Sequence, residues 1–482
     1  MKRSFLFFWV TLLFTTSVTC QQNWTHGRLK VSDNGHFLVY EDGSPFFWMG
    51  DTGWELFHRL DRKEAVSYLK KRKEQGFNVI QAVLLSEFEG LTVPNAYGAL
   101  PLIDGDPAKL KITPGNDTMI ASEYDYWDHC DFIIKKAEEM GIFIGLLPCW
   151  GEYVIPREGR AIFNTVDQAY TYGNILGKRY HSQRNIIWIL GGDRLPDERT
   201  NGLALWRAMA KGIADGTNGK YDIVGVTDYT TTLMTYHCFA SSSQWFQHDD
   251  WLDFNMWGSY HSDYSITKAY EQSMSDWDIS DPKPTINGEP AYEEHAVNWL
   301  ENNGIFLAYD VRQVAYWSVF GGAFGHTYGC NPVWQFYDKN RNPITFVHNY
   351  WQTALNDEGA NQMKYLKNLI ESRPMLKRVP DQSVILKGAG TGSNHCVASR
   401  GENYIFVYIP TGYPVTIQMG KISGDSVKAS WYNPRNGETT EIGMYQNSGE
   451  KEFIPKGISK QLDWLKTGRG CDWVLILDGK SN

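Results

Sequence analysis

The segment from residue 46 to residue 329 alternates short apolar runs with charged, amphipathic stretches, and this alternation constrains the fold more than any other feature. Four or five consecutive apolar residues, many of them β-branched, are typical of strands buried on both faces in a parallel sheet. The predicted strands are residues 46–50, 78–85, 142–147, 185–193, 222–227, 254–260, 284–289 and 322–328. The predicted helices include residues 61–74, 124–140, 167–180 and 308–319. Eight strands with intervening helices predict an α/β domain with the fold of a closed (β/α)8 barrel.

The pattern changes near residue 380. A helix is predicted over residues 345–372, and Arg373-Pro374 ends it. Short alternating runs then follow, such as residues 403–409 and 473–477, and turn clusters separate them, which predicts an all-β sandwich of about 100 residues. A chain of 482 residues also exceeds the roughly 300 residues that one core usually supports. We therefore predict the barrel over residues 21–379 and the sandwich over residues 380–482.

The N-terminus resembles a secretory signal. Lys2 and Arg3 precede a short apolar stretch over residues 4–14, so residues 1–20 are predicted to be a signal peptide that is absent from the mature protein. Cys20 is either the lipidated residue of a loose bacterial lipoprotein signal, and hence a lipid anchor, or the last residue before ordinary cleavage. No later segment is long and apolar enough to span a bilayer.

Charge and cysteine spacing exclude several functions. The net charge of −9, without a basic stripe, argues against a nucleic-acid partner. No C-x-x-C or H-E-x-x-H motif is present, so we expect neither a metal nor another cofactor. The six cysteines after Cys20 lie at positions 130, 149, 238, 330, 396 and 471, without a close-spaced disulfide framework. Cys396 and Cys471 are either a disulfide within the last domain or buried free thiols. The sequence leaves the oligomeric state open.

Two predicted strands end in small residues and a carboxylic acid, at Gly191-Gly192-Asp193 and at Gly288-Glu289. The carboxyl ends of barrel strands share one rim, so these acids can face the same substrate despite their separation in sequence. Glycoside hydrolysis needs one acid that protonates the leaving oxygen and one carboxylate that attacks the anomeric carbon or activates water. By analogy with barrel glycosidases, we predict Asp193 as the acid/base and Glu289 as the nucleophile. The alternative is that each acid only caps the following helix.

Other residues at predicted strand ends are candidates for substrate binding. Asp51, Trp54 and His58 follow the first strand, where they either hydrogen-bond and stack a sugar or cap a helix and pack inward. The remaining candidates on the predicted rim are Gln81, Trp150, Tyr236, His237, Trp257, His261, His326 and Tyr328. Competing carboxylates in loop-like or helical settings are Glu55, Glu87, Glu89, Glu152, Glu293 and Glu294. A long excursion over residues 86–122 also follows a strand end, which is typical of an active-site loop.

Three motifs carry a family resemblance: FFWMGDTGWEL at residues 46–56, NIIWILGGD at 185–193 and INGEP at 286–290. They resemble the DUF4038-type barrel, with the GH140 apiosidases of gut Bacteroidetes as the best match, and residues 381–482 are similar to the domain named "putative collagen-binding". The resemblance implies a retaining glycoside hydrolase that acts on an apiosyl linkage in pectic rhamnogalacturonan II, with Asp193 and Glu289 in the roles given above. Together with the signal-like N-terminus, we expect an exported protein, periplasmic or cell-surface-associated in a Gram-negative bacterium.

One departure and several alternatives accompany this resemblance. The wider superfamily usually has Asn-Glu at the acid/base position, whereas this chain has Gly192-Asp193, so backbone position or a deeper substrate must compensate for the shorter acid. The alternatives are a glycosidase for another furanoside or another plant or host glycan, and a non-catalytic glycan-binding surface protein. The C-terminal domain is expected to pack against the barrel rather than to bind collagen. A carboxyl separation of about 5 to 5.5 Å would favour retention, and roughly 6.5 to 9.5 Å inversion.

Overall fold

The computed structural model describes residues 24–120, 122–157, 161–237, 239–263, 266–457 and 471–481. The predicted signal peptide with Cys20, and also Cys238, lie outside the described residues. Within the described ranges, none of the helices combines the length and the hydropathy that crossing a membrane requires.

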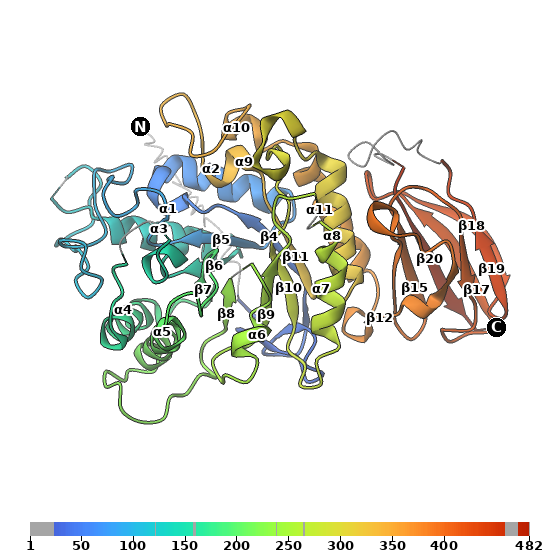
Figure 1. Cartoon of the computed structure of the whole chain (residues 1–482), viewed down its shortest axis with the longest axis horizontal. Coiled ribbons are helices and arrows are strands. Elements are labelled where there is room, and N and C mark those ends of the chain that lie inside the picture. The colour runs from blue at the N-terminus through green and yellow to red at the C-terminus, as the bar shows by residue number, and fades with distance from the viewer. Residues whose placement is uncertain are drawn as a thin grey trace, which may run out of the picture.

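Eight parallel strands in chain order surround the barrel axis (Figure 1). They are β4 (Trp48–Thr52), β5 (Val79–Val83), β6 (Phe143–Leu147), β7 (Ile186–Gly191), β8 (Met234–His237), β9 (Asn255–Gly258), β10 (Thr285–Glu289) and β11 (Gly325–Tyr328). A continuous sheet runs from β11 through β4 to β8, and β9 pairs with β10. Single backbone hydrogen bonds bridge the two remaining seams, from Asp253 N to Met234 O at 2.9 Å and from Phe324 N to Thr285 O at 3.0 Å. The predicted barrel is thus confirmed.

Helices follow the strands and cover the outside of the barrel (Figure 1). The α-helices are α1 (Leu56–Arg59), α2 (Arg62–Glu74), α3 (Tyr126–Glu139), α4 (Val166–Tyr180), α5 (Gly202–Thr217), α6 (Ser243–Phe246), α7 (Lys268–Trp277), α8 (Ala308–Phe320), α9 (Asn331–Trp334), α10 (Trp351–Ala354) and α11 (Glu358–Glu371). The 3-10 turns are η1 (Gly151–Tyr153), η2 (Val297–Trp299), η3 (Glu301–Asn303), η4 (Met375–Lys377), η5 (Gln382–Val384) and η6 (Gly392–Asn394). Helix α2 begins where the sequence predicts, because Asp61 accepts a hydrogen bond from Glu64 N at 2.8 Å and Glu64 accepts one from Asp61 N.

Two predicted elements are wrong. Residues 222–227 form no strand, and the fifth barrel strand is β8. Val224 and Val226 are 79% and 90% exposed, so this apolar run lies on the surface instead of in the core. The single helix predicted over residues 345–372 is two helices, α10 and α11, which the bend at residues 355–357 separates. Helices α5 and α7 and a small N-terminal sheet were not predicted. This antiparallel sheet comprises β1 (Leu29–Val31), β2 (Leu38–Tyr40) and β3 (Pro45–Phe46).

The C-terminal domain is a sandwich of two antiparallel sheets. One sheet has the order β12 (Val379–Pro380), β14 (Val397–Arg400), β15 (Tyr404–Ile409), β20 (Trp473–Lys480), β17 (Ser426–Tyr432) and β18 (Thr439–Gln446). The other has the order β13 (Ile385–Lys387), β16 (Val415–Gln418) and β19 (Glu450–Phe453). The two sheets enclose a small apolar core of their own. Cys396 and Cys471 are both free thiols, so the disulfide reading is not supported.

The sandwich packs against helix α8, as expected for the C-terminal domain (Figure 1). Tyr316 of α8 stacks on Tyr408 of β15 with ring centroids 5.0 Å apart. Arg312 Nε lies 2.7 Å from Asp472 Oδ2 in a buried ion pair between the two domains. The barrel and the larger sheet of the sandwich therefore share one continuous core.

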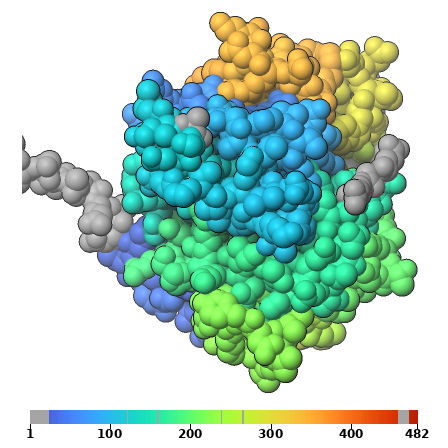
Figure 2. All heavy atoms as spheres, turned by 90° about the vertical axis from the view of Figure 1, so that its left-hand side faces the viewer, coloured from blue at the N-terminus to red at the C-terminus, as the bar shows by residue number. Residues whose placement is uncertain are grey.

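The segment between β5 and α3 leaves the barrel at the carboxyl end of β5. It lies at the left of Figure 1, and in Figure 2, which faces that side, its blue to cyan atoms cover the centre of the surface. The excursion expected from the sequence therefore extends the barrel on the side of the strand ends, where the candidate acids lie.

Candidate active site

The turn after β7 presents Asp193 to the barrel interior. Gly191 and Gly192 have φ of +90° and +128°, and Asp193 itself has φ of +52°. A Cβ atom on Gly192 would lie 2.8 Å from Gly151 N and from the Trp150 ring, so only glycine fits this close approach. A left-handed conformation is costly for an aspartate, and such strain is found mainly where function requires a fixed side-chain direction.

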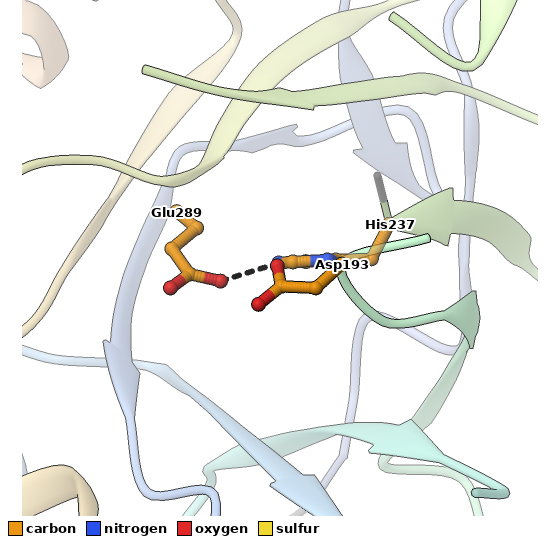
Figure 3. Close-up of side chains that lie close together, drawn as sticks. All are labelled: Asp193, His237 and Glu289. Atoms are coloured by element: carbon orange, nitrogen blue, oxygen red, sulfur yellow. Dashed lines mark ion pairs between the residues drawn. The ribbon is translucent and has the colours of Figure 1, made fainter. Parts of the chain in front are cut away.

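Glu289 is the last residue of β10 and lies close to Asp193. One oxygen of each carboxyl group and one ring nitrogen of His237 all lie within 4.8 Å of one another (Figure 3). His237 Nε2 is 3.0 Å from Glu289 Oε2, and His261 Nε2 is 3.3 Å from Glu289 Oε1. The nucleophile predicted from the sequence thus has an imidazole at each of its two oxygens.

The two carboxyl groups have pKa values that move in opposite directions. Burial and then the neighbouring charge of Glu289 raise the pKa of Asp193 to about 7. Burial alone would raise the pKa of Glu289 as well, but its contacts with His237 and His261 outweigh burial and lower that pKa to about 2. Near neutral pH the pair therefore offers a proton on Asp193 and a charge on Glu289, and this is the division of roles between a general acid and a nucleophile.

An arginine fixes the backbone of the Asp193 turn. Arg194 Nη1 donates a hydrogen bond to Asp193 O at 3.0 Å, and Arg194 Nε and Nη2 donate to Glu152 Oε2 at 3.0 and 2.5 Å. Glu87 Oε1 lies 3.5 Å from Arg194 Nη2, and burial followed by the charge of Asp193 raises the pKa of Glu87 to about 8. Glu87 and Glu152, which the sequence grouped with competing carboxylates, thus lie beside the proposed acid.

Several candidate substrate-binding residues gather around the pair. The Trp54 ring lies 5.2 Å from the Trp150 ring and 5.6 Å from the His237 ring, so two indoles border the histidine. Gln81 Nε2 donates a hydrogen bond to Gly288 O at 2.8 Å, from β5 across to β10, and its Oε1 is buried without a partner among the described residues. Gln81 therefore fixes the strand end that carries Glu289.

Other candidates have protein partners away from the pair. Asp51 is not in a loop but inside β4, where it binds Arg72 Nε at 2.7 Å and accepts a hydrogen bond from Tyr68 at 2.5 Å. His58 contacts Glu55 Oε2 at 2.7 Å and Val93 O at 3.0 Å, and so links α1 to the excursion after β5. These contacts indicate that both residues stabilise the fold and do not bind a sugar directly.

Three rim candidates also have protein partners away from the pair, and a fourth is buried in its strand. Tyr236 donates to Arg194 O, Trp257 to Thr285 Oγ1 and Tyr328 to Glu293 Oε2, at 3.0, 2.9 and 2.5 Å. His326 is fully buried in β11, and burial lowers its pKa to about 3, so its ring is neutral. We interpret these four residues as structural, because alternate residues of a barrel strand point toward the helices and not into the barrel.

The structure adds two tyrosines that the sequence analysis did not select. Tyr260 N donates to Glu289 O at 3.0 Å, and a hydrogen bond from the Tyr260 side chain counteracts the raised pKa of Asp193. Tyr292 accepts a hydrogen bond from Trp54 Nε1 at 3.1 Å, and burial followed by the charge of Glu289 raises its own pKa. The sequence offered a signal for each tyrosine, because Tyr260 ends the predicted strand 254–260 and Tyr292 follows Glu289 by three residues.

Asp193, His237 and Glu289 are also close enough together to offer three ligand atoms to a metal ion. His237 Nε2 already faces Glu289 Oε2, and the opposite pKa shifts of the two carboxyl groups suit proton transfer. We therefore interpret this cluster as an acid–base centre.

The chain is similar to known proteins in sequence and in fold. The family model "Apiosidase-like, catalytic domain" matches residues 32–377, and the model "Putative collagen-binding domain of a collagenase" matches residues 379–478. A solved structure named "Glycoside hydrolase" is 37% identical, covers 95% of this chain and 98% of its own, and has a TM-score of 0.83. A glycoside hydrolase family 5 structure from Bacteroides vulgatus ATCC 8482 is 36% identical, with 95% and 94% covered and a TM-score of 0.82. None of the curated proteins matches the chain.

Proposed function

Because the chain belongs to the apiosidase-like family of glycoside hydrolases, we propose that it cleaves an apiosyl linkage in pectic rhamnogalacturonan II with retention of configuration. The observation that carries this proposal is the pair of carboxyl groups at Asp193 and Glu289, which lie close together and differ in protonation. The description of the matching family model supports apiose as the sugar.

The proposed reaction has two steps. Glu289 attacks the anomeric carbon while Asp193 gives its proton to the departing glycosidic oxygen, and a covalent glycosyl-enzyme forms. Asp193 then removes a proton from a water molecule that attacks the same carbon and releases the sugar from Glu289. His237 and His261 hold Glu289 ionised before the first step, and Arg194 keeps the acid/base turn in place.

The short distance between the carboxyl groups favours this double displacement. Oxygens of Asp193 and Glu289 lie within 4.8 Å of each other. Inverting enzymes need roughly 6.5 to 9.5 Å between the carboxyl groups to admit a water molecule, whereas retaining enzymes have about 5 to 5.5 Å. The left-handed turn at Asp193 also offers an explanation for the use of a short acid at this position, because backbone position replaces side-chain length.

We further propose that the enzyme acts in the periplasm or at the cell surface of a Gram-negative bacterium. The signal-like residues 1–20 support export, and Cys20 is the proposed site of a lipid anchor. Mass spectrometry of the mature protein purified from membranes tests the anchor, since an acylated N-terminal cysteine is heavier than an unmodified one by the mass of its lipid.

The function is tested with wild type, Asp193→Asn and Glu289→Gln incubated with rhamnogalacturonan II oligosaccharides. Mass spectrometry of the products is expected to show cleavage at apiose by the wild type alone. Cleavage by all three proteins would contradict the catalytic assignment. Cleavage by none, with glycan binding intact in all three, would favour the non-catalytic binding protein, and cleavage of another furanoside instead would change the substrate.

A further inference from the structure

A hairpin after Glu289 carries an exposed tryptophan at its tip. Backbone hydrogen bonds join its two arms, from Glu294 N to Phe306 O at 2.9 Å, from Phe306 N to His295 O at 3.0 Å and from Val297 N to Gly304 O at 3.0 Å. The tip residues Trp299 and Leu300 are each 60% exposed. The hairpin is thus stabilised by hydrogen bonds between its arms and exposes two large apolar side chains to solvent.

Trp299 is connected to the catalytic nucleophile by a short series of ring contacts. Its ring lies 4.4 Å from the His295 ring and 5.2 Å from the His261 ring. His261 and His295 stack with centroids 4.0 Å apart, and His261 Nε2 is 3.3 Å from Glu289 Oε1. One imidazole therefore separates the exposed indole from the carboxylate that we assign as nucleophile.

The backbone of the tip is strained in a way that fixes the indole. Asn298 and Trp299 have φ of +56° and +63°, a region that bulky residues rarely adopt. Asn298 N donates to His261 O at 2.9 Å, and Asn298 Oδ1 accepts from Asp263 N at 3.1 Å. These two hydrogen bonds connect the tip to the segment that contains His261 and stabilise it in the strained conformation. Strained backbone that neighbouring contacts stabilise in this way is found mainly at functional sites.

A single exposed apolar residue needs no functional explanation. Leu300 is such a residue, because it is as exposed as Trp299 and takes no part in the ring contacts. Trp299 differs from it in three respects: a flat aromatic surface, strained backbone geometry and contact with the histidine that binds Glu289. Leu300 is therefore a matched control on the same tip.

We propose that Trp299 is a stacking platform for a second sugar ring of the glycan, next to the ring that is hydrolysed at Asp193 and Glu289. This inference rests on the proposed glycosidase function. An indole offers a large, rigid apolar face with little conformational freedom to lose, and this matches the C–H face of a pyranose. The substrate is then an oligosaccharide that spans at least two sugar positions, rather than a lone apioside.

The test compares Trp299→Ala, Trp299→Phe and Leu300→Ala with the wild type, on a rhamnogalacturonan II oligosaccharide and on methyl apioside. Trp299→Ala is expected to lower kcat/KM for the oligosaccharide, relative to that for methyl apioside, by roughly twofold to tenfold, since ring stacking is worth about 0.5 to 1.5 kcal/mol and a factor of ten is 1.4 kcal/mol. The loss is expected in KM rather than in kcat. Trp299→Phe is expected to restore most of it, and Leu300→Ala to match the wild type.

Binding is measured separately, by calorimetry of the same oligosaccharide with the three tip substitutions in the inactive Glu289→Gln background. Weaker binding for Trp299→Ala than for Leu300→Ala is the result expected for a platform. Equal binding and equal kinetics for these two variants would overturn the platform while leaving the hydrolase assignment intact. Failure of the wild type to cleave the oligosaccharide would overturn the proposed function itself, together with the inference that rests on it.

Discussion

Replacing Glu289 by Gln should lower the pKa of Asp193. In the proposed mechanism Asp193 acts as an acid while Glu289 is charged. Asp193 acts as a base after Glu289 has bound the sugar and lost its charge. The Glu289→Gln variant imitates that second state, because its amide is neutral. Burial and the charge of Glu289 are the two largest causes that raise the pKa of Asp193 to about 7, and the substitution removes the second.

The size of this effect follows from the geometry. The nearest oxygens of the two carboxyl groups lie within 4.8 Å of each other. At an effective dielectric constant of about 20, two unit charges at this distance repel by roughly 3.5 kcal/mol, which corresponds to about 2.5 pH units. The contact with Glu289 outweighs burial and raises the pKa of His237, which favours a positive charge there that offsets part of the repulsion. We therefore expect the pKa of Asp193 to fall by roughly one to two pH units.

The assay is a carbon-13 NMR titration of enzyme with labelled aspartate carboxyl groups, in which the signal of Asp193 is identified by its loss in Asp193→Asn. Glu87→Gln is the matched control: Glu87 is another carboxyl group beside the site, but its pKa of about 8 leaves it largely uncharged near neutral pH. An unchanged pKa of Asp193 in Glu289→Gln, or an equal fall in both variants, would refute the electrostatic reasoning.

Three further predictions concern the acid limb, thermal stability and the domain interface. His261→Ala should raise the pKa of Glu289, because one of the two imidazoles that stabilise the carboxylate is lost. The acid limb of the kcat/KM profile should therefore move upward by about one pH unit. An unchanged pH–rate profile would contradict this. The pKa of Asp193 is higher in the folded than in the unfolded protein, so the stability that Asp193 contributes is full below its unfolded pKa near 3.9 and declines as pH rises to about 7. Asp193→Asn should therefore melt at a higher temperature than the wild type at pH 8 and at the same temperature near pH 4. Differential scanning calorimetry measures both melting temperatures. Arg312→Met leaves buried Asp472 without its closest cation and should lower the free energy of unfolding by about 3 kcal/mol in urea titrations; a loss below about 1 kcal/mol would show that this ion pair does not hold the domains together.

Much of the barrel could be predicted because its signals are local. Each buried parallel strand is a run of apolar residues, and the two acids follow such runs directly. Short windows of sequence were therefore enough to predict the fold class and the positions of Asp193 and Glu289 at strand ends. The false strand at residues 222–227 has the same local pattern, but Val224 and Val226 face solvent. Burial depends on tertiary contacts, and a short apolar run alone does not determine it.

The candidate site was harder to predict than the fold because it depends on side-chain direction. Asp51 and Gln81 both lie on barrel strands, yet Asp51 turns outward to Arg72 whereas Gln81 reaches Gly288 across the barrel. The first strand was predicted two residues too early, so Asp51 was expected in the loop after the strand, whereas it lies inside β4. The contacts from Trp299 to His261 join segments that the sequence gives no reason to pair.

The most direct test of the central claim is to trap the covalent intermediate. Asp193→Ala, mixed with an aryl apioside whose leaving group needs no protonation, should accumulate a glycosyl-enzyme, because the first step proceeds without an acid and the second lacks its base. Intact-protein mass spectrometry is expected to show the mass of one added glycosyl residue, and peptide mapping to locate it on Glu289. An adduct on another residue, or turnover with inverted configuration and no adduct, would contradict the assignment of Glu289 as nucleophile.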